Sequence, residues 1–443
     1  MFGTSGVRGA FGEDVDASLA LDIAHAVAVD ADRVVVGWDA RDTGRAMSAA
    51  MKAGFMECGV DVVEVGTSST PTIARAIETV DADAGVAITA SHNPAPDNGV
   101  KLWTPSGQAF DSDEQAAIEA RVERGAIPHA AWDEQGSTER WNRATEAHRR
   151  DLVAAGTERA GESGLTGLHV VVDIGNGMGG VTADALHELG ATVETLNAQP
   201  DGRFPGRPSE PTAETCAGLV DHVAARDADL GIAHDGDADR MMAVDDNGRF
   251  VPGDVLLAVF ATEFAIPGGR IAAPVDTSLA VDDAVEKVGA SVVHTRVGDV
   301  YVAEETRNPD VTFGGEPSGA WIFPGETLCP DGPLAAVILA TLAVKQSLSD
   351  RIAAVSTYPT RRDAIETERK ATVMEAVTKR VESAYDVTRL DGVRVETTDG
   401  WFLIRASGTQ PLIRVTAEAR DSDAADAIRE EALNIVASAR KTT

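Results

Sequence analysis

The chain of 443 residues repeats one pattern of secondary structure three times. Each copy has an apolar segment that ends in aspartate, a helical stretch that ends in glycine, and a second apolar segment. Glycine suits the C-terminal end of a helix, where a positive φ favours it. The first segments are 33–39, 169–173 and 271–276, the glycines are Gly59, Gly190 and Gly289, and the second segments are 60–65, 191–196 and 290–295. Because apolar strands alternate with helices, we expect parallel sheets covered on both faces.

The C-terminal part of the chain departs from this pattern from about Ser356 onward. It predicts an α+β unit with a hairpin near Asp399 and Gly400. The expected helices are 372–383 and 422–437, and the expected strands are 401–405 and 413–418. We therefore expect four domains, at residues 1–150, 151–250, 251–355 and 356–443, with a charged helical stretch at 117–155 across the first boundary.

A polar segment follows the third strand of each repeat, at residues 89–94, 235–240 and 315–319. Ligands of open α/β sheets gather at the carboxyl ends of the strands. Equivalent positions in three similar units therefore make these segments the first places to look for chemistry.

The second of these segments carries a carboxylate at every other position. Asp235, Asp237 and Asp239 lie on one side of an extended loop, and three hard oxygen ligands suit Mg²⁺. An EF-hand is excluded because Arg240 stands at its sixth position, where glycine is needed. The alternative is a solvated acidic turn, which does not explain why like charges crowd behind an apolar strand.

The first polar segment places Ser91 beside His92 in a loop that ends in Asn-Pro. We interpret Ser91 as a nucleophile or a carrier of phosphate, although no GxSxG pattern frames it. A phosphoryl group there would bring nearly two negative charges and three acceptor oxygens, which could complete the metal site. The alternative is a serine turn that caps a helix.

Three further segments have the composition of sugar or anion sites. Glu316 and Ser318 could accept and donate hydrogen bonds to neighbouring sugar hydroxyls, or could simply form a turn. The segment with Arg405, Ser407, Gly408 and Thr409, followed by Arg414, fits a phosphate group, or else a solvated turn between strands. The glycine-rich segment 3–9 contains Arg8 but is not a Walker A loop.

Composition narrows the classes of partner. A formal net charge of −32 disfavours nucleic acid and anionic membranes, which bind basic patches. The counts of 41 Asp against 30 Glu and 32 Arg against 7 Lys favour adaptation to high salt over an ordinary acidic enzyme. The three cysteines form no CxxC pair, so no zinc site is expected. With no signal-peptide pattern and no long apolar run, we expect a cytoplasmic protein.

These motifs, in this order along the whole chain, resemble the α-D-phosphohexomutase family. Segments 98–101, 173–180 and 296–301 support the resemblance. It implies three similar α/β/α domains with mixed, mostly parallel sheets, and a smaller C-terminal α+β domain, around a central cleft. It also implies that phosphate moves between a serine and a hexose through a hexose 1,6-bisphosphate.

The resemblance carries roles onto single residues of this sequence. Ser91 would be the phosphoserine, and with it Asp235, Asp237 and Asp239 would bind one Mg²⁺ per subunit. The cations Arg8 and Arg240 would stabilise the moving phosphoryl group, and His92 and Lys101 are candidates for acid–base work. The sugar hydroxyls would be held by Glu316 and Ser318, and the second phosphate by Arg405, Ser407, Gly408, Thr409 and Arg414.

Within the family the chain is more similar to the branch that interconverts glucosamine 6-phosphate and glucosamine 1-phosphate. The alternatives are a mutase of glucose or mannose phosphates, a serine-dependent sugar phosphatase, and a phosphosugar-binding protein without catalysis. We expect a monomer or a homodimer with a small-molecule phosphosugar as its substrate.

Overall fold

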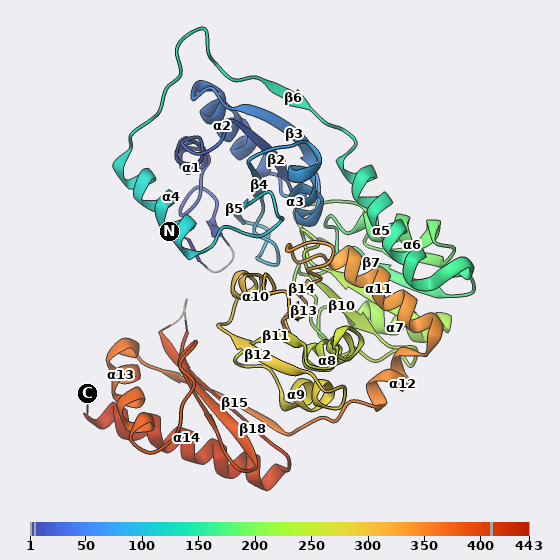
Figure 1. Cartoon of the computed structure of the whole chain (residues 1–443), viewed down its shortest axis with the longest axis vertical. Helices are drawn as coiled ribbons and strands as arrows, with labels where there is room; N and C mark the ends of the chain where they lie inside the picture. The colour runs from blue at the N-terminus through green and yellow to red at the C-terminus, as the bar shows by residue number, and fades with distance from the viewer. Residues whose placement is uncertain (1, 4–5, 408–410, 443) are drawn as a thin grey trace.

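The computed structural model describes residues 2–3, 6–407 and 411–442, and in it the chain forms four sheets with helices packed against each (Figure 1). We refer to the four units built on these sheets as the first to fourth domains. In Figure 1 they follow one another from blue through green and yellow to red, and the fourth lies beside the third.

The first domain contains a sheet of six strands in the order β1-β5-β4-β2-β3-β6. Its strands are β1 (Val7–Ala10), β2 (Arg33–Trp38), β3 (Asp61–Thr67), β4 (Ala84–Ile88), β5 (Asp97–Trp103) and β6 (Thr138–Arg140), and its helices are α1 (Ala17–Val27), α2 (Gly44–Glu57), α3 (Thr70–Thr79) and α4 (Ser112–Arg124). The strands β2, β3, β4 and β6 pair in parallel, whereas β5 is antiparallel to both β4 and β1.

The second domain repeats the parallel unit in a four-stranded sheet of order β10-β9-β7-β8. Its elements are α5 (Ala144–Ala160), a 3₁₀ turn (Gly161–Ser163), β7 (His169–Asp173), α6 (Gly180–Glu188), β8 (Thr192–Leu196), α7 (Ala217–Arg226), β9 (Leu230–His234) and β10 (Met241–Val244). Only β10 runs antiparallel to its neighbour in this sheet.

The third domain has the strand order β12-β11-β13-β14. Its elements are α8 (Gly253–Phe264), β11 (Arg270–Pro274), α9 (Leu279–Glu286), β12 (Ser291–Thr295), α10 (Asp299–Glu305), β13 (Val311–Gly315), β14 (Trp321–Ile322), α11 (Gly332–Lys345) and α12 (Leu348–Ala353). The fourth domain is antiparallel, in the order β15-β18-β17-β16. Its elements are β15 (Thr360–Glu366), α13 (Lys370–Glu382), β16 (Val393–Glu396), β17 (Gly400–Ala406), β18 (Leu412–Ala419) and α14 (Ser422–Thr442).

The first strand of each repeat is buried on both faces, as the apolar runs predict. Val34 and Val36 of β2 belong to one core cluster and Val35 to another. The same alternation separates Val171 from its neighbours in β7 and Ala272 from its neighbours in β11. The glycines that close the helices have positive φ, +86° at Gly59, +98° at Gly190 and +84° at Gly289. The predicted repeat is therefore confirmed.

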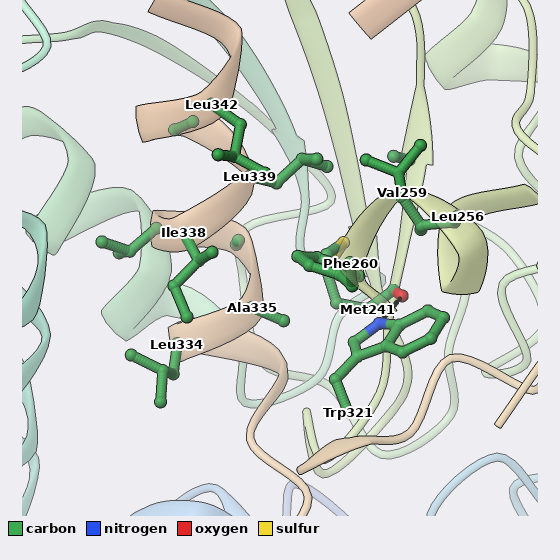
Figure 2. Close-up of a cluster of buried hydrophobic side chains, with 14 of the residues drawn as sticks. Met241, Leu256, Val259, Phe260, Trp321, Leu334, Ala335, Ile338, Leu339 and Leu342 are labelled. Atoms are coloured by element: carbon green, nitrogen blue, oxygen red, sulfur yellow. Dashed lines mark hydrogen bonds between the residues drawn. The ribbon is translucent and has the colours of Figure 1, made fainter. Parts of the chain in front are cut away.

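The second and third domains share one continuous core. The helix α11 is apolar around its whole circumference, and its residues belong to one core cluster with residues from both sheets. Figure 2 shows Ala335 and Leu339 on the side of α11 that faces Phe260 of α8, and Leu334 and Ile338 on its other side. Trp321 of the third domain donates its indole N–H to the carbonyl of Met241 in the second, at 2.8 Å. This shared core fixes the second polar loop relative to the third.

The charged stretch 117–155 is not helical throughout, so that expectation was wrong. The helix α4 ends at Gly125, which has the left-handed φ of +61°. The chain then runs without helix to β6, which adds a short parallel strand beside β3, before α5 begins. Edge pairing with the sheet therefore replaces helix in the middle of the stretch. No helix in the described part of the chain is long and apolar enough to cross a membrane.

Candidate active site

The acidic loop, residues 235–240, begins where β9 ends. Asp235, Asp237 and Asp239 are all buried, and each offers an oxygen within 4.8 Å of the others. Within the described residues, the Oδ1 atoms of Asp237 and Asp239 are buried without a hydrogen-bond partner. Convergent carboxylate oxygens with unused acceptor capacity fit a hard divalent cation such as Mg²⁺. The predicted grouping of these three residues is confirmed.

Lys101 of β5 is the cation that contacts this loop from the first domain. Its Nζ lies 2.8 Å from Oδ2 of Asp237 and also pairs with Asp239. Burial acts to raise the pKa of Asp237, but Lys101 and the hydroxyl of Thr70 hold that pKa well below its usual range. Burial and the neighbouring carboxylates raise the pKa of Asp235. One lysine therefore does not balance three carboxylates in this loop.

The serine loop, residues 89–94, follows β4 and meets the acidic loop from the other domain. The hydroxyl of Ser91 donates to Oδ2 of Asp235 at 2.5 Å. Ser91 has a φ of +50°, a left-handed conformation that a residue with a Cβ rarely adopts. Its backbone N–H donates to Oγ1 of Thr89 at 2.8 Å. The structure thus brings the predicted phosphate carrier to the predicted metal ligands.

Arg41 holds the serine loop in this conformation, and the motif analysis did not single it out. The side chain is buried, and its two Nη atoms donate to four carbonyl oxygens in the serine loop and just beyond it. The acceptors are Ser91 at 2.9 Å, Asn93 at 2.7 Å, Pro94 at 2.6 Å and Asp97 at 2.8 Å. Its Nε donates to Asp39, the aspartate that ends the first repeat segment, at 3.1 Å.

The second repeat uses an equivalent arrangement. Arg207 is buried and donates from Nε to Asp173, the aspartate that ends the repeat segment there, at 2.6 Å. Its Nη2 donates to the carbonyl of His234, directly before the acidic loop, at 2.6 Å. The aspartate that ends each of these strand segments was identified from the sequence, but the arginine that pairs with it was not.

His92 lies beside Ser91, and Arg240 and Arg8 bring positive charge near the His92 ring. Burial, followed by the nearby Arg240 and Arg8, lowers the pKa of His92 to about 2, so its ring is neutral at ordinary pH. Its Nδ1 lies 3.5 Å from the Ser91 hydroxyl oxygen. The Nε of Arg8 is buried and has no hydrogen-bond partner among the described residues.

The third polar loop lies against the acidic loop from the third domain. The backbone N–H of Gly298 donates to Glu316 at 2.8 Å, and the hydroxyl of Ser318 donates to the same carboxylate at 3.1 Å. Burial, then Asp299, raises the pKa of Glu316 to about 7. Glu316 and Ser318 line a cavity of about 120 Å³ together with Asp254, Asp276 and Arg362. A neighbouring bridge pairs Arg240 with Ala320, which joins the two loops.

The predicted phosphate loop belongs to the fourth domain, and the structure describes only part of it. Arg405 and Arg414 are direct partners across β17 and β18, so they share one face of the sheet. Arg405 pairs with Asp391 at 2.9 Å and with Asp276 of the third domain at 3.9 Å. Ser407 is buried and its carbonyl accepts from Lys370 at 2.6 Å. Gly408 and Thr409 lie outside the described residues.

Comparison with known proteins gives one consistent family. Models of the phosphoglucomutase/phosphomannomutase family match all four parts of the chain, namely α/β/α domain I at residues 1–127, domain II at 151–248, domain III at 252–358 and the C-terminal domain at 364–435. A relative from Methanococcoides burtonii, named "Probable phosphoglucosamine mutase", is 43% identical over 98% of both chains.

Two solved structures show the same fold. A phosphoglucomutase/phosphomannomutase family protein from Burkholderia thailandensis is 26% identical, with a TM-score of 0.87 over 99% of this chain and 98% of that one. An N-acetylphosphoglucosamine mutase from Aspergillus fumigatus, solved with GlcNAc-6P and magnesium, is 16% identical, with a TM-score of 0.61 over 99% of this chain and 95% of that one. The second comparison concerns the fold alone.

Proposed function

The chain belongs to the phosphoglucomutase/phosphomannomutase family, and on that premise we propose that it interconverts glucosamine 6-phosphate and glucosamine 1-phosphate. The observation that carries the chemistry is the 2.5 Å hydrogen bond from the Ser91 hydroxyl to Asp235. The choice of an amino sugar is supported by the name of the relative from Methanococcoides burtonii.

Ser91 carries the phosphoryl group in this proposal. The Ser91–phosphorus bond breaks as a free hydroxyl of the bound sugar phosphate forms its own bond to phosphorus, which yields a hexose 1,6-bisphosphate. After the bisphosphate turns around, Ser91 takes back the other phosphoryl group. His92, whose Nδ1 lies 3.5 Å from the Ser91 hydroxyl oxygen, and Lys101 are the candidates for the acid–base work. The charged Lys101 is suited to stabilise the serine oxygen as the bond to phosphorus breaks.

Asp235, Asp237 and Asp239, with an oxygen of the phosphorylated Ser91, would hold one Mg²⁺. When bound, this ion supplies a positive charge that offsets the charge on the phosphoryl oxygens. Arg8 and Arg240 add fixed positive charge near His92, the neighbour of Ser91, and would stabilise the charge that spreads over the equatorial oxygens in the transition state.

The third and fourth domains hold the substrate at its far end. Glu316 and Ser318 would bind sugar hydroxyls at the cavity that they line. Arg405, Ser407, Gly408, Thr409 and Arg414 would bind the phosphate that does not react. Because this binding site can hold either end of the bisphosphate, positions 1 and 6 can exchange. We also propose a cytoplasmic monomer or homodimer, activated by a hexose 1,6-bisphosphate and adapted to high salt, that does not bind nucleic acid.

Turnover of three substrates tests the assignment. The purified protein is given Mg²⁺ and glucose 1,6-bisphosphate with glucosamine 1-phosphate, glucose 1-phosphate or mannose 1-phosphate. We expect the glucosamine substrate to have the highest kcat/KM. Glucosamine as the slowest substrate would contradict the assignment, and release of inorganic phosphate without exchange would indicate a phosphatase instead.

A further inference from the structure

The serine loop and the acidic loop share one buried hydroxyl that belongs to neither. Ser209, in the second domain, is only 3% exposed. Its hydroxyl donates to the backbone carbonyl of Ser91 at 2.8 Å. The same oxygen accepts the backbone N–H of Gly236, in the acidic loop, at 2.9 Å. Ser209 therefore joins the backbones of two loops that come from different domains.

The loops touch at this point, and little space remains between them. A Cβ added to Gly236 would lie 2.8 Å from both the Ser91 carbonyl oxygen and the Ser209 hydroxyl oxygen. A separation this short between the two loops is compatible only with glycine at position 236. The hydroxyl of Ser209 consequently lies at the closest approach of the two loops.

Ser209 is itself held firmly. Its carbonyl accepts from Nη1 of Arg207 at 3.2 Å, and Nη2 of the same guanidinium holds the carbonyl of His234 before the acidic loop. The Ser91 carbonyl in turn accepts from Arg41 as well as from Ser209. Both acceptor positions of that carbonyl are therefore used, one by each domain.

We propose that Ser209 is a positioning residue that fixes the separation between the Ser91 hydroxyl and the acidic loop during phosphoryl transfer. The proposal rests on the proposed function. Phosphorylated Ser91 places nearly two negative charges beside three carboxylates, and one divalent cation offsets only part of that charge, so repulsion acts to separate the loops. The two hydrogen bonds that the Ser209 hydroxyl makes with the backbones of the two loops oppose that separation.

A Ser209→Ala variant tests this role by removing both hydrogen bonds. We expect kcat with glucosamine 6-phosphate to fall about 10- to 100-fold, because a displacement of an ångström at the reacting atoms has an effect of this size. KM is expected to change by less than about threefold, because the substrate is held by the third and fourth domains. The value of kcat is taken per folded molecule, with the folded fraction measured by circular dichroism, because a merely structural role would lower that fraction and leave kcat per folded molecule unchanged.

The matched control is Ser48→Ala, another buried serine of the chain. Its hydroxyl makes no hydrogen bond within the described residues, so its loss should leave both constants unchanged. Should the alanine variant not fold, Ser209→Cys keeps the shape of the side chain with a somewhat larger sulfur that weakens both bonds, and an intermediate loss of kcat is expected. Wild-type kcat in either folded variant would overturn the proposal, as would a raised KM with unchanged kcat.

The two hypotheses fail in different ways. A wild-type protein that exchanges no phosphosugar would contradict the proposed function, whatever the Ser209 variants do. A wild-type mutase whose Ser209→Ala variant keeps its kcat would leave the function in place and refute only the positioning role.

Discussion

The aspartate that ends the first strand segment of each repeat has different partners in the first two domains and in the third. Asp39 and Asp173, at the ends of the first two repeat segments, are buried and pair with arginines of their own domains. Asp276, at the equivalent position of the third repeat, is more exposed and lies 3.9 Å from Arg405 of the fourth domain. The fourth domain also supplies Arg394, which donates to the carbonyl of Val275 at 2.6 Å.

This difference suggests that the first two domains serve phosphoryl transfer and that the third and fourth serve substrate binding. The serine loop and the acidic loop, which we propose carry the phosphoryl chemistry, are held by Arg41 and Arg207 of their own domains. The segment after β11, whose Asp276 lines the same cavity as Glu316, is held by contacts that the fourth domain brings to it. Changes in the first two domains should therefore act on kcat, and changes at the third and fourth domains should act on KM.

The largest expected effect follows from Asp237→Asn in the acidic loop. Loss of one carboxylate weakens the metal site and leaves Lys101 without a charged partner at that position. We expect kcat to fall about 10³-fold. A chelator should likewise abolish wild-type activity, and added Mg²⁺ should restore it.

The control for this variant is Asp221→Asn, an exposed change on α7 of the same domain. It should keep wild-type kcat. An active Asp237→Asn protein, or a wild type whose activity does not change with chelator or Mg²⁺, would contradict the claim that the acidic loop binds a required metal ion.

The next effect concerns stability and the buried carboxyl of Glu316. Its pKa is about 7 in the folded chain against 4.5 as the ordinary value, so the folded state holds the proton more tightly. The contribution to the free energy of unfolding therefore falls as pH rises from 4.5 to about 7, and is constant above that. Glu316→Gln lacks this decline, so it should gain up to about 3 kcal/mol relative to wild type across the window.

Urea unfolding at fixed salt, measured across that pH range, gives this difference. If the free energies of unfolding of wild type and Glu316→Gln changed in parallel with pH, the burial of Glu316 would not raise its pKa, contrary to the structure. The result bears on the comparison because it reports on the third domain without any substrate.

Arg41→Lys should have a smaller effect, confined to kcat. A lysine cannot donate to four carbonyls at once, so the serine loop loses its fixed conformation. We expect kcat to fall about 30-fold with KM nearly unchanged. Arg45→Lys, an exposed change on α2, is the control. An Arg41→Lys protein in which only KM changes would contradict the expected division of effects between the first two domains and the other two.

The same substitution in the fourth domain should act on the other constant. Arg405→Lys loses the planar pair of donors that suits a phosphate group, so KM should rise about tenfold while kcat stays within about threefold. Arg389→Lys, an exposed arginine of the fourth domain, is the control. Equal effects on kcat from Arg41→Lys and Arg405→Lys would show that the two regions do not divide the work.

The sequence predicted the parts of this molecule that depend on local order. Apolar runs and helix-ending glycines were enough for the three repeats, and the positions of Ser91 and the three aspartates after their strands were enough to bring them together. The antiparallel fourth sheet was also expected, and its last helix, α14, extends beyond the predicted end. Each of these features depends on short-range patterning and on the common edge where parallel strands end.

The contacts that the sequence did not predict join residues far apart in the chain. Arg41 lies 50 residues from Ser91, and Ser209 lies 118 residues from it. A lone arginine or serine carries no periodic signal, and its role appears only when folding brings distant segments of the chain together. The middle of 117–155 was also missed, because its strand depends on a partner, β3, elsewhere in the chain.

The mass of the intact protein tests the central claim, that Ser91 carries the phosphoryl group, most directly. After incubation with glucose 1,6-bisphosphate and Mg²⁺, the wild-type chain should gain the mass of one phosphoryl group, which peptide mapping should place on Ser91. Added glucosamine 6-phosphate should remove it. Ser91→Ala should gain no phosphoryl group and show no exchange. An active Ser91→Ala protein, or a phosphoryl group on another residue, would contradict the account.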